Sequence, residues 1–566
     1  MCGIFALLNS YEYSPNIIRT CFHLGQGRGP ESSVLDDFCE NTITLGFHRL
    51  AINGLNNISN QPLVRGSLRL ICNGEIYNYK QLYEMLHMNA MTESDCEVIL
   101  HLYEKFGIEK AVQLLDGVFA FVLLDLKEKK VYVARDMFGV RPLYRLSSST
   151  STIGFASEMK QLSEIYHERC TEYTLQHFPP GSIATYYQEE KNRFNINLPP
   201  LWKLDFEKKW TGIPSTQSFS YSHAEPVPYE KAIEPWLPLI RDRLVEAVEK
   251  RCGASERPIA CLLSGGLDSS LVTALVNQYH IKHCLPKLET FSIGLSGSTD
   301  LVYAKKVAEH LGTKHTEIIL TKEDFFCSLP EVVKAIESYD TTTVRASIGN
   351  YLVGKCIRNS SEAKVIFNGD GSDEVTGGYL YFHKSPNAIE FDLECRRLLE
   401  DIHMFDVLRS DRCISTHGLE PRTPFLDKAF VQTYLSIPST LRFYAKHGKC
   451  EKHLLRAAFS EYINVEGKSL LPSEIIWRKK EAFSDGVTAQ NTCLSNIISN
   501  QLLSFNENFH SFVNDSSLTS EKLYYKFLFE KYFKTLDHIV PYYWMPKFIE
   551  GVVDASARNL SIYNEL

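Results

Sequence analysis

The hydrophobic pattern of the 566-residue chain changes near residue 200. Before that point, short alternating or β-branched runs predominate, and such runs are typical of strands. They are GIFALL at 3–8, TITLGF at 42–47, LRLIC at 68–72, GVFAFVLLDL at 117–126, VYVAR at 131–135 and TIGFA at 152–156. Helical spacing is found around 79–87 and 94–106. Because strands outnumber helices and seldom alternate with them, we expect an antiparallel α+β domain.

After residue 230, strands and helices alternate along the chain, which predicts a parallel α/β sheet. The expected strands are PIACLL, LETFSIGL, TEIIL and KVIFNG, and the expected helices are 230–252, 300–311, 322–337 and 346–358. Beyond 390 the pattern is mainly helical and includes an amphipathic stretch, EKLYYKFLFEKYF. We therefore expect domains at 2–200 and 230–566, joined by a polar linker over 201–229 that contains proline and glycine.

Composition excludes several classes of function. With 60 Lys and Arg against 68 Asp and Glu, the net charge is −8, which gives no bulk attraction to nucleic acid or to an anionic membrane. No apolar run is long enough to span a bilayer, and no secretory signal is evident. The 15 scattered cysteines contain no C-x-x-C pair, which favours reduced thiols in a cytosolic chain. Small molecules are the expected partners.

The second residue is the first candidate catalytic group. Removal of Met1 would leave Cys2 with both a thiol and an α-amine, whose pKa is about 7.7–8.0. Such an amine can act as general base for its own side chain. Alternatively, Cys2 is a small buried hydrophobe on a strand.

Three motifs that follow contain the other groups needed to hydrolyse an amide. Asn73 and Gly74 could form an oxyanion hole, Arg49 could pair with an α-carboxylate, and Asp95 could hold an α-ammonium. Each has a purely structural alternative: a hairpin turn for Asn73-Gly74, a surface salt bridge for Arg49 and a helix N-terminal charge for Asp95.

Together these segments resemble the glutaminase domain of class II glutamine amidotransferases, which are N-terminal nucleophile hydrolases. The resemblance rests on MCGIF, R-G-P at 28–30, HRLAI, NGEIYN, SDCEVI, DGVFAF, ARDMFGVRPLY and ASEMK. It implies an αββα sandwich, Cys2 as nucleophile, and glutamine binding by Arg49, Asn73, Gly74, Glu75 and Asp95. One departure is that Gln26 and Gly27 replace the family's usual Arg-His.

A second candidate site begins at LLSGGLDSS, 262–270, directly after an apolar strand. A strand, a Ser-Gly-Gly turn and a helix present backbone N–H groups to phosphate oxygens. Asp268 suits a magnesium ligand there. A second acidic loop, NGDGSDE at 368–374, also follows a strand, so Asp373 could share that ion at the carboxyl edge of the sheet. The alternatives are an ordinary strand–helix turn and a solvated acidic turn.

This half resembles the PP-loop synthetases, which adenylate a carboxylate and release pyrophosphate. Joined to the first half, it resembles glutamine-hydrolysing asparagine synthetases. Further matches are GLSGSTDLVYAKKVAEHLGTKH, ESYDTTTVRAS, GGYLYFHKSPNA, GLEPRTPFLD, GKCEKHLLR and RKKEAFSDGV. The resemblance implies glutamine, aspartate and ATP as substrates, Mg²⁺ as cofactor and a possible homodimer.

The resemblance also implies roles for individual residues. ATP would be held by Leu262, Ser264, Gly265, Gly266, Asp268, Ser269, Ser270, Ile293 and Gly369. Asp268 and Asp373 would bind the metal, Lys449 would meet the charge on phosphate, and Thr342, Thr343 and Arg345 would clamp the aspartyl group. Without the resemblance, Lys449 would be interpreted as a surface lysine.

One departure affects the chemistry directly. The family's loop usually reads S-G-E-G-S-D-E, whereas Asn368 and Asp370 stand here for its serine and glutamate. That glutamate is thought to take a proton from ammonia, and Asp370 reaches one methylene less. We therefore expect activity with an altered rate. A passage lined by small or apolar residues should carry ammonia from Cys2 to Asp370.

Two other functions fit parts of the pattern. One is a related amide-bond synthetase that acts on another carboxylate, as β-lactam synthetases do, but those lack a usable N-terminal cysteine. The other is a non-catalytic pseudoenzyme on the same fold. The presence of Cys2, Asp268, Asp373 and Lys449 argues against the pseudoenzyme.

Overall fold

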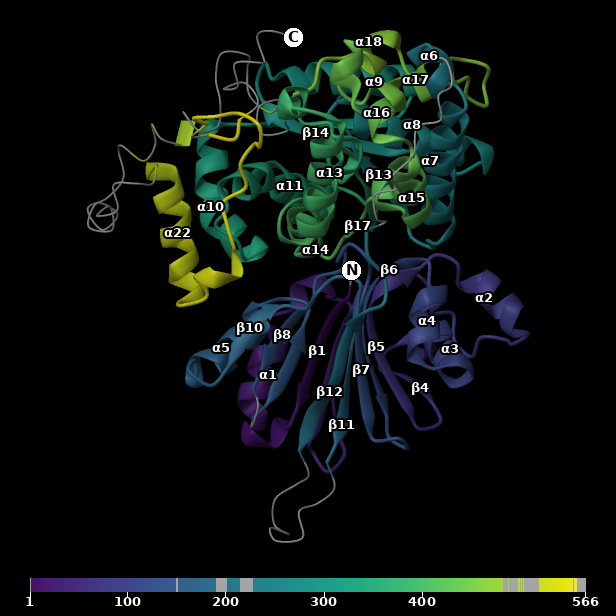
Figure 1. The fold of residues 1–566 in the computed structure, drawn as a ribbon. Coiled ribbons are helices and arrows are strands. Elements are labelled where there is room, and N and C mark those ends of the chain that lie inside the picture. The colour runs from purple at the N-terminus through teal and green to yellow at the C-terminus, as the bar shows by residue number, and fades with distance from the viewer. Residues whose placement is uncertain are drawn as a thin grey trace.

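The structure is a computed structural model that describes residues 2–148, 151–189, 201–213, 227–481 and 519–552, together with 487, 497–498, 500, 502 and 554–556. A half built on strands meets a half rich in helices, and the N-terminus lies where the two halves meet (Figure 1). In the described part of the chain, no helix is both long enough and apolar enough to cross a membrane.

The first half contains two stacked antiparallel sheets of six strands each (Figure 1). One has the order β10-β8-β9-β1-β3-β2, with β1 (Gly3–Leu8), β2 (Ser32–Phe38), β3 (Ile43–Arg49), β8 (Tyr144–Ser147), β9 (Ile153–Ala156) and β10 (Thr174–His177). The other has the order β12-β11-β7-β6-β5-β4, with β4 (Leu63–Arg65), β5 (Leu68–Ile76), β6 (Gly117–Asp125), β7 (Lys130–Arg135), β11 (Ser182–Gln188) and β12 (Trp202–Lys209).

Helices cover the outer face of each sheet, which confirms the expected αββα sandwich. One sheet packs against α1 (Pro15–His23) and α5 (Lys160–Glu168). The other packs against α2 (Tyr79–Leu86), α3 (Val98–Phe106) and α4 (Ile108–Leu114). Strand β1 is buried along its whole length because it has a covered neighbour on both faces. Ile4 faces the core between the sheets, whereas Phe5 faces the helices.

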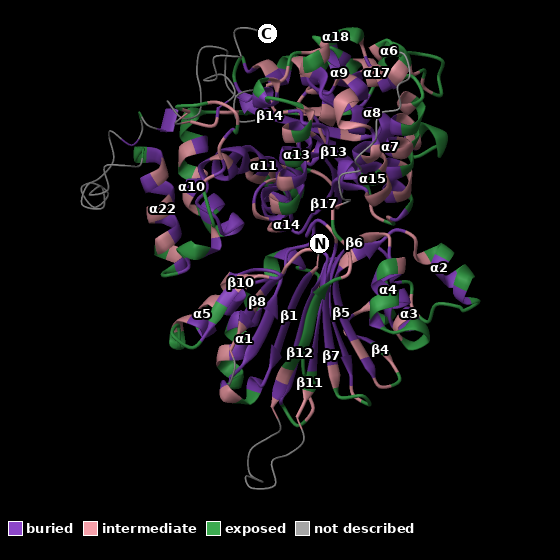
Figure 2. Cartoon of the chain, viewed as in Figure 1, coloured by how far each residue is buried: buried purple, intermediate pink, exposed green. Residues whose placement is uncertain are grey.

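The expected linker begins too early. Residues 202–209 form β12, which pairs with β11 in an antiparallel register, so the first half continues to Lys209. The hydrophobic pattern did not predict this strand, because it lies at the edge of the sheet and most of its residues are exposed (Figure 2). Part of the expected linker, 214–226, lies outside the described residues.

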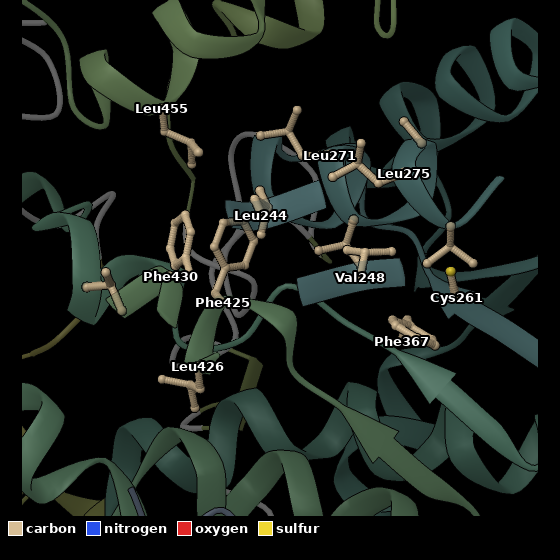
Figure 3. Packing of buried hydrophobic residues seen from close by; sticks show 14 of the residues in the cluster. Leu244, Val248, Cys261, Leu271, Leu275, Phe367, Phe425, Leu426, Phe430 and Leu455 are labelled. Atoms are coloured by element: carbon tan, nitrogen blue, oxygen red, sulfur yellow. The ribbon is translucent and has the colours of Figure 1, made fainter. Parts of the chain in front are cut away.

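The second half contains the expected parallel sheet, with the order β15-β14-β13-β16-β17. Its strands are β13 (Ile259–Leu262), β14 (Glu289–Leu295), β15 (Lys314–Leu320), β16 (Val365–Phe367) and β17 (Glu420–Arg422). Figure 3 shows the core on one side of this sheet, where Cys261 and Phe367 from the strands pack near Leu244, Val248 and Leu271 from the helices.

The helices surround this sheet as the alternating pattern predicts. They are α6 (Tyr229–Ile233), α7 (Trp236–Gly253), α8 (Leu267–Lys282), α9 (Thr299–Leu311), α10 (Lys322–Ile336), α11 (Thr341–Ser360), α12 (Ser372–Thr376), α13 (Ala388–Asp401), α14 (Asp406–Ser415), α15 (Lys428–Ser436), α16 (Ser439–Arg442), α17 (His453–Ser460), α18 (Ser473–Ile476) and α22 (Ser520–Phe533). The helix expected over 521–533 is confirmed as α22. The expected helix at 230–252 is divided into α6 and α7.

Buried ion pairs join the two halves. The guanidinium of Arg28 donates to both carboxylate oxygens of Asp411 on α14, at 2.7 and 3.2 Å. Its Nε also donates to the backbone carbonyl of Cys2 at 3.0 Å. Arg422 on β17 pairs with Glu75 on β5 at 3.3 Å. The orientation of the second half is therefore tied to the strands that carry the first candidate site.

Candidate active sites

The first candidate site lies at one end of the sandwich, against the second half. Cys2 precedes β1, Arg49 ends β3, and Asp95 begins the single-turn helix Asp95–Glu97. The thiol of Cys2 donates to the carbonyl of Leu50 at 3.5 Å. Cys2 lies close enough to Arg49 to raise the pKa of its guanidinium, against the opposite effect of burial. Glu75 lies close enough to Cys2 to raise the pKa of its thiol. The structure therefore brings these predicted residues together.

Asn73, Gly74 and Glu75 lie within a strand and not in a turn. All three belong to β5, where Asn73 pairs with Ala120 and Gly74 pairs with Phe119 of β6. The hairpin-turn alternative for Asn73-Gly74 is therefore wrong. An Asn-Gly pair usually favours a turn. Here it lies inside a strand that continues to Ile76 and is buried along most of its length, so the pairing of the strand outweighs the local preference.

Asn73 and Gly74 present the two kinds of donor that an oxyanion hole needs, a side-chain carboxamide and a backbone N–H. The side chain of Asn73 is completely buried, and neither atom of its carboxamide has a hydrogen-bond partner among the described residues. Leaving such a group unpaired is costly, which suits a site whose ligand completes it. The backbone of Phe119 bonds to Asp136 instead of β5. The N–H of Gly74 opposite it therefore points away from β6.

The guanidinium of Arg49 is buried, so the surface salt bridge alternative is wrong. It donates to the carbonyl of Asn56 at 2.9 Å, to Oδ1 of Asn60 at 2.6 Å and to the carbonyl of Gly54. These contacts fix the loop after β3 around the arginine. Burial lowers the pKa of Arg49, and a nearby anion would offset that effect.

Asp95 and Glu75 are buried carboxyl groups of this site. Asp95 accepts from the N–H of Ile76 at 2.6 Å, and Glu75 accepts from Asn53 at 2.8 Å. Burial raises the pKa of Asp95 to about 6, against the opposing effect of the Ile76 N–H. Burial also raises the pKa of Glu75, to which the neighbouring charge of Glu420 contributes. A cationic group placed between these carboxylates would favour their ionised forms.

Burial raises the pKa of the Cys2 thiol to about 11. At neutral pH the thiol is therefore protonated, and a nucleophilic role requires a base in contact with it. The α-amine that Met1 removal would expose belongs to Cys2 itself and could fill that role.

The second candidate site lies at the carboxyl edge of the parallel sheet. Strand β13 leads through the turn Ser264–Gly266 into α8, as expected. Gly265 has φ +72°, and a Cβ there would come within 2.4 Å of the backbone nitrogen of Ala304. The hydroxyl groups of Ser264 and Ser269 lie 3.0 Å apart and close the turn. Only glycine fits this close approach to α9.

A cavity opens above this turn. Most of the predicted nucleotide residues line it: Leu262, Ser264, Gly266, Asp268, Ser269, Ile293 and Gly369. Thr342, Asp370 and Asp373 line it as well. Gly265 and Ser270 are absent from the lining, because Gly265 faces α9 and Ser270 is buried within α8.

The two predicted metal ligands lie side by side. One ammonium, that of Lys452, lies 2.6 Å from Oδ2 of Asp268 and 2.6 Å from Oδ1 of Asp373. Lys480 contacts Asp373 at 2.6 Å. Burial would raise the pKa of Asp373, but these two ammonium groups outweigh burial and hold the pKa below its ordinary value.

Two carboxylates that can share one ammonium can also share a divalent cation, and Mg²⁺ prefers oxygen ligands. No described group of three or more His, Cys, Asp or Glu side chains is arranged to hold a metal. The oxygen donors of Asp268 and Asp373 fit a magnesium ion.

Lys449 does not occupy the position expected of it. It is partly exposed and pairs with Glu230 at 2.7 Å, outside the lining of the main cavity. The buried cation is Lys452, three residues later, whose left-handed backbone (φ 58°) lies at the start of α17. The stretch that the sequence singled out therefore places Lys452, and not Lys449, beside the two carboxylates, because the backbone turn decides which side chain points inward.

The predicted aspartyl clamp is only partly assembled. Thr342 lines the cavity, whereas the hydroxyl of Thr343 donates to Asp340 at 2.7 Å and helps to cap α11. Arg345 donates to both oxygens of Glu521 on α22, at 2.7 and 2.5 Å, and to Asp554 at 2.5 Å. These carboxylates lie far along the chain, so the sequence could not show that they hold this guanidinium away from the cavity.

Several residues of the sites were missed. Lys452 and Lys480 stand in the segments GKCEKHLLR and RKKEAFSDGV, so their neighbourhood was recognised although their roles were not. Arg28, in the R-G-P segment, joins Cys2 to Asp411. Arg409 on α14 contacts Asp370 at 3.1 Å, a contact without a local sequence signal.

Comparison with known proteins assigns a family to each half. Residues 1–192 match the family described as glutamine amidotransferase domain, and residues 239–392 and 383–538 match the family described as asparagine synthase. The chain is 40% identical over 588 residues to "Asparagine synthetase [glutamine-hydrolyzing]" of Gallus gallus, covering 100% of this chain and 99% of that protein. It is 38% identical over 587 residues to the protein of the same name from Homo sapiens, with the same coverage.

Among solved structures, the chain is similar to glutamine phosphoribosylpyrophosphate amidotransferase from B. subtilis. That match has 17% identity and a TM-score of 0.29, and covers 56% of this chain and 81% of that one. It adds nothing to the argument from sequence relatives.

We expect Lys452→Met to destabilise the fold much more than Lys449→Met. The first substitution removes the ammonium that Asp268 and Asp373 share and leaves these partly buried carboxylates with Lys480 alone, a loss of about 3 kcal/mol. The second removes an exposed pair worth about 0–1 kcal/mol. Thermal unfolding of both variants measures the difference, and added Mg²⁺ should raise the Tm of Lys452→Met more than that of the unaltered chain. Equal Tm values for the two variants would contradict this assignment.

Proposed function

Because the chain belongs to the family of glutamine-hydrolysing asparagine synthetases, we propose that it hydrolyses glutamine and uses the ammonia to amidate aspartate at the expense of ATP. The observation that carries this proposal is the joining of two sites by buried contacts, an N-terminal cysteine in one half and a phosphate-binding turn in the other. Both sites retain the groups that their chemistry needs.

The first reaction takes place at Cys2. Its sulfur attacks the carboxamide carbon of glutamine, while the α-amine takes the thiol proton and passes it to the leaving nitrogen. The C–N bond breaks, ammonia leaves and a thioester remains, which water then hydrolyses to glutamate and the free thiol. Asn73 and Gly74 stabilise the oxyanion formed in both steps. Arg49 binds the substrate's α-carboxylate, and Asp95, assisted by Glu75, binds its α-ammonium.

The second reaction takes place above the turn Ser264–Gly266. A β-carboxylate oxygen of aspartate attacks the α-phosphorus of ATP, pyrophosphate leaves, and β-aspartyl-AMP forms. Backbone N–H groups of the turn and the N-terminus of α8 stabilise the phosphates. Lys452 and Lys480, which line the cavity, provide the positive charge that was expected from Lys449 and would stabilise the charge that develops on the leaving pyrophosphate.

Magnesium would be held by Asp268 and Asp373. When bound, it would neutralise phosphate charge and orient the leaving group.

Ammonia completes the reaction. Its nitrogen attacks the β-carbonyl carbon of the adenylate, AMP leaves, and a proton passes from the nitrogen to a base. Asp370 lines the cavity and has one carboxylate oxygen without a hydrogen-bond partner among the described residues, which supports this role. Because ammonia that reaches bulk water is protonated and lost as a nucleophile, we propose that it crosses the junction between Cys2 and Asp370.

The proposal also includes the cellular compartment, the assembly state and the choice between an active enzyme and a pseudoenzyme. The 14 described cysteines are free thiols, which supports a reducing compartment such as the cytosol. A homodimer is supported by the family resemblance alone. The buried, unpartnered carboxamide of Asn73 favours an active glutaminase over a pseudoenzyme, because a site without turnover has no reason to retain this cost.

A direct test uses the purified chain after mass measurement has confirmed that Met1 is absent. The chain is incubated with aspartate, ATP, Mg²⁺ and either glutamine or ammonium. We expect asparagine and AMP from both nitrogen donors. Cys2→Ala should abolish the reaction with glutamine and leave the reaction with ammonium within about threefold of its original rate. Adenylation of another carboxylate, with no asparagine from either donor, would overturn the proposal.

The pH dependence of glutamine hydrolysis tests the role of Asp95. The pKa of this carboxyl group is raised to about 6, so it is ionised above that pH and becomes neutral as the pH falls. A neutral acid cannot pair with the substrate ammonium. We expect kcat/KM for glutamine hydrolysis to fall about tenfold per pH unit below pH 6.

The matched variant is Asp95→Asn. It should have a low kcat/KM at pH 8 and should lose this particular pH dependence. An acidic limb that stays unchanged in Asp95→Asn would assign the titration to another group, such as Glu75.

A further inference from the structure

The loop Asn368–Gly371 departs from the family at two positions, and the structure shows what surrounds both. We propose that Asn368 and Ser410 are positioning residues that fix the loop to α14 and so place the short carboxylate of Asp370 for the amidation step. This inference rests on the proposed function, because it assigns the machinery that serves its final step.

Asn368 joins the loop to the helix. Its Nδ2 donates to the hydroxyl oxygen of Ser410 at 2.7 Å, and its Oδ1 accepts from the backbone N–H of Asp370 at 3.3 Å. Both side chains are almost completely buried, with exposed fractions of 4% for Asn368 and 1% for Ser410. A serine at 368 has a single, shorter polar group and could not make both contacts.

Burial raises the pKa of the Asp370 carboxyl group, and contacts with the guanidinium of Arg409 and the hydroxyl of Ser410 oppose that rise. Oδ1 of Asp370 accepts from Nη2 of Arg409 at 3.1 Å. Its Oδ2 is buried and has no hydrogen-bond partner among the described residues, while Asp370 itself lines the cavity. A carboxylate with one anchored and one free oxygen is suited to accept a proton from a nucleophile that arrives in the cavity.

The anchor itself is fixed. Nε of Arg409 donates to Oδ1 of Asp406 at 2.8 Å, and Oδ2 of Asp406 accepts from the hydroxyl of Tyr379 at 2.9 Å. The same hydroxyl oxygen lies 2.6 Å from Oε1 of Glu374, so its single proton is shared between the two carboxyl groups. Arg409 therefore cannot follow a carboxylate that moves, so the position of the loop decides whether Asp370 reaches it.

These contacts explain how Asp370, which is one methylene shorter than the family's glutamate, can act as the base in amidation. The amide of Asn368 holds the backbone of residue 370 against the helix that carries Ser410 and Arg409, which brings the carboxylate to its anchor. A longer glutamate on the same backbone would push its carboxylate past this position. Misplacement of a reacting group by about 1 Å costs on the order of 100-fold in rate.

The test measures two steps separately in the full chain with ammonium as donor. Aspartate-dependent pyrophosphate release reports adenylation, and asparagine formation in a single turnover reports amidation. We expect Ser410→Ala to slow amidation by about 10-fold to 100-fold and to leave adenylation within about threefold. The control is Ser347→Ala, which removes an equally buried hydroxyl, bonded to the carbonyl of Thr343, outside this contact; both steps should stay within about threefold.

Two further variants test the mechanism of positioning. If Asn368 and Ser410 act as one unit, Asn368→Ala combined with Ser410→Ala should be no worse than either change alone. Asp370→Glu alone should slow amidation, and adding Asn368→Ser should recover about tenfold of that loss. The proposal would be overturned if the rate losses of Asn368→Ala and Ser410→Ala multiply in the double variant. Full amidation activity of Asp370→Glu alone would also overturn it.

A readout that does not depend on activity separates this proposal from the proposed function. Backbone amides at 369–371 should exchange hydrogen faster in Ser410→Ala than in Ser347→Ala or in the unaltered chain. Unchanged exchange would overturn the positioning role even in a chain that makes asparagine. Failure of the proposed function would instead appear as absent aspartate-dependent pyrophosphate release in the unaltered chain.

Discussion

The arrangement of both sites depends on one buried guanidinium, that of Arg28. It binds the backbone carbonyl of Cys2 in one half and the carboxylate of Asp411 on α14 in the other. Leaving one buried charge of such a pair without its partner costs about 3–5 kcal/mol, so this contact strongly favours a single arrangement of the halves. The same helix contributes Arg409 and Ser410 to the surroundings of Asp370. One helix therefore helps to position both Cys2 and Asp370, the two residues between which we propose that ammonia passes.

The junction between the sites is charged. Arg422 contacts Glu75 and Glu420, and Arg141 lies 3.7 Å from Glu420 and 3.9 Å from Asp411. The sequence led us to expect small or apolar residues along the path of ammonia, and one hydrophobic cluster contains residues of both halves, among them Leu50, Val140 and Leu426, so that expectation stays a prediction. Paired charges can still transmit a neutral molecule, because opposite partners that satisfy each other present little net field. Such pairing would also disfavour the ammonium ion, which would have to compete with the arginines for the same carboxylates.

The fold was predictable because its signals are local. Alternating runs indicated the antiparallel sandwich, and the strand–helix rhythm indicated the parallel sheet with its glycine turn at Gly265. Contacts between distant segments were not predictable in the same way. The Asn73-Gly74 turn signal yielded to the pairing of β5 with β6, and Arg345 is engaged by Glu521 and Asp554, far along the chain. The positions of Lys449 and Lys452 could not be predicted either, because the left-handed backbone of Lys452 directs its side chain inward and leaves Lys449 partly exposed.

The central claim is that the two sites act as one enzyme across the junction. It is tested most directly by supplying glutamine labelled with ¹⁵N in the amide, together with aspartate, ATP, Mg²⁺ and an excess of unlabelled ammonium below its own KM. The account predicts that the asparagine formed carries the label almost completely and that glutamate and asparagine appear in equal amounts. Asparagine whose label is diluted toward that of the bulk ammonium, with glutamate in excess, would show that ammonia escapes to solvent and would contradict the account.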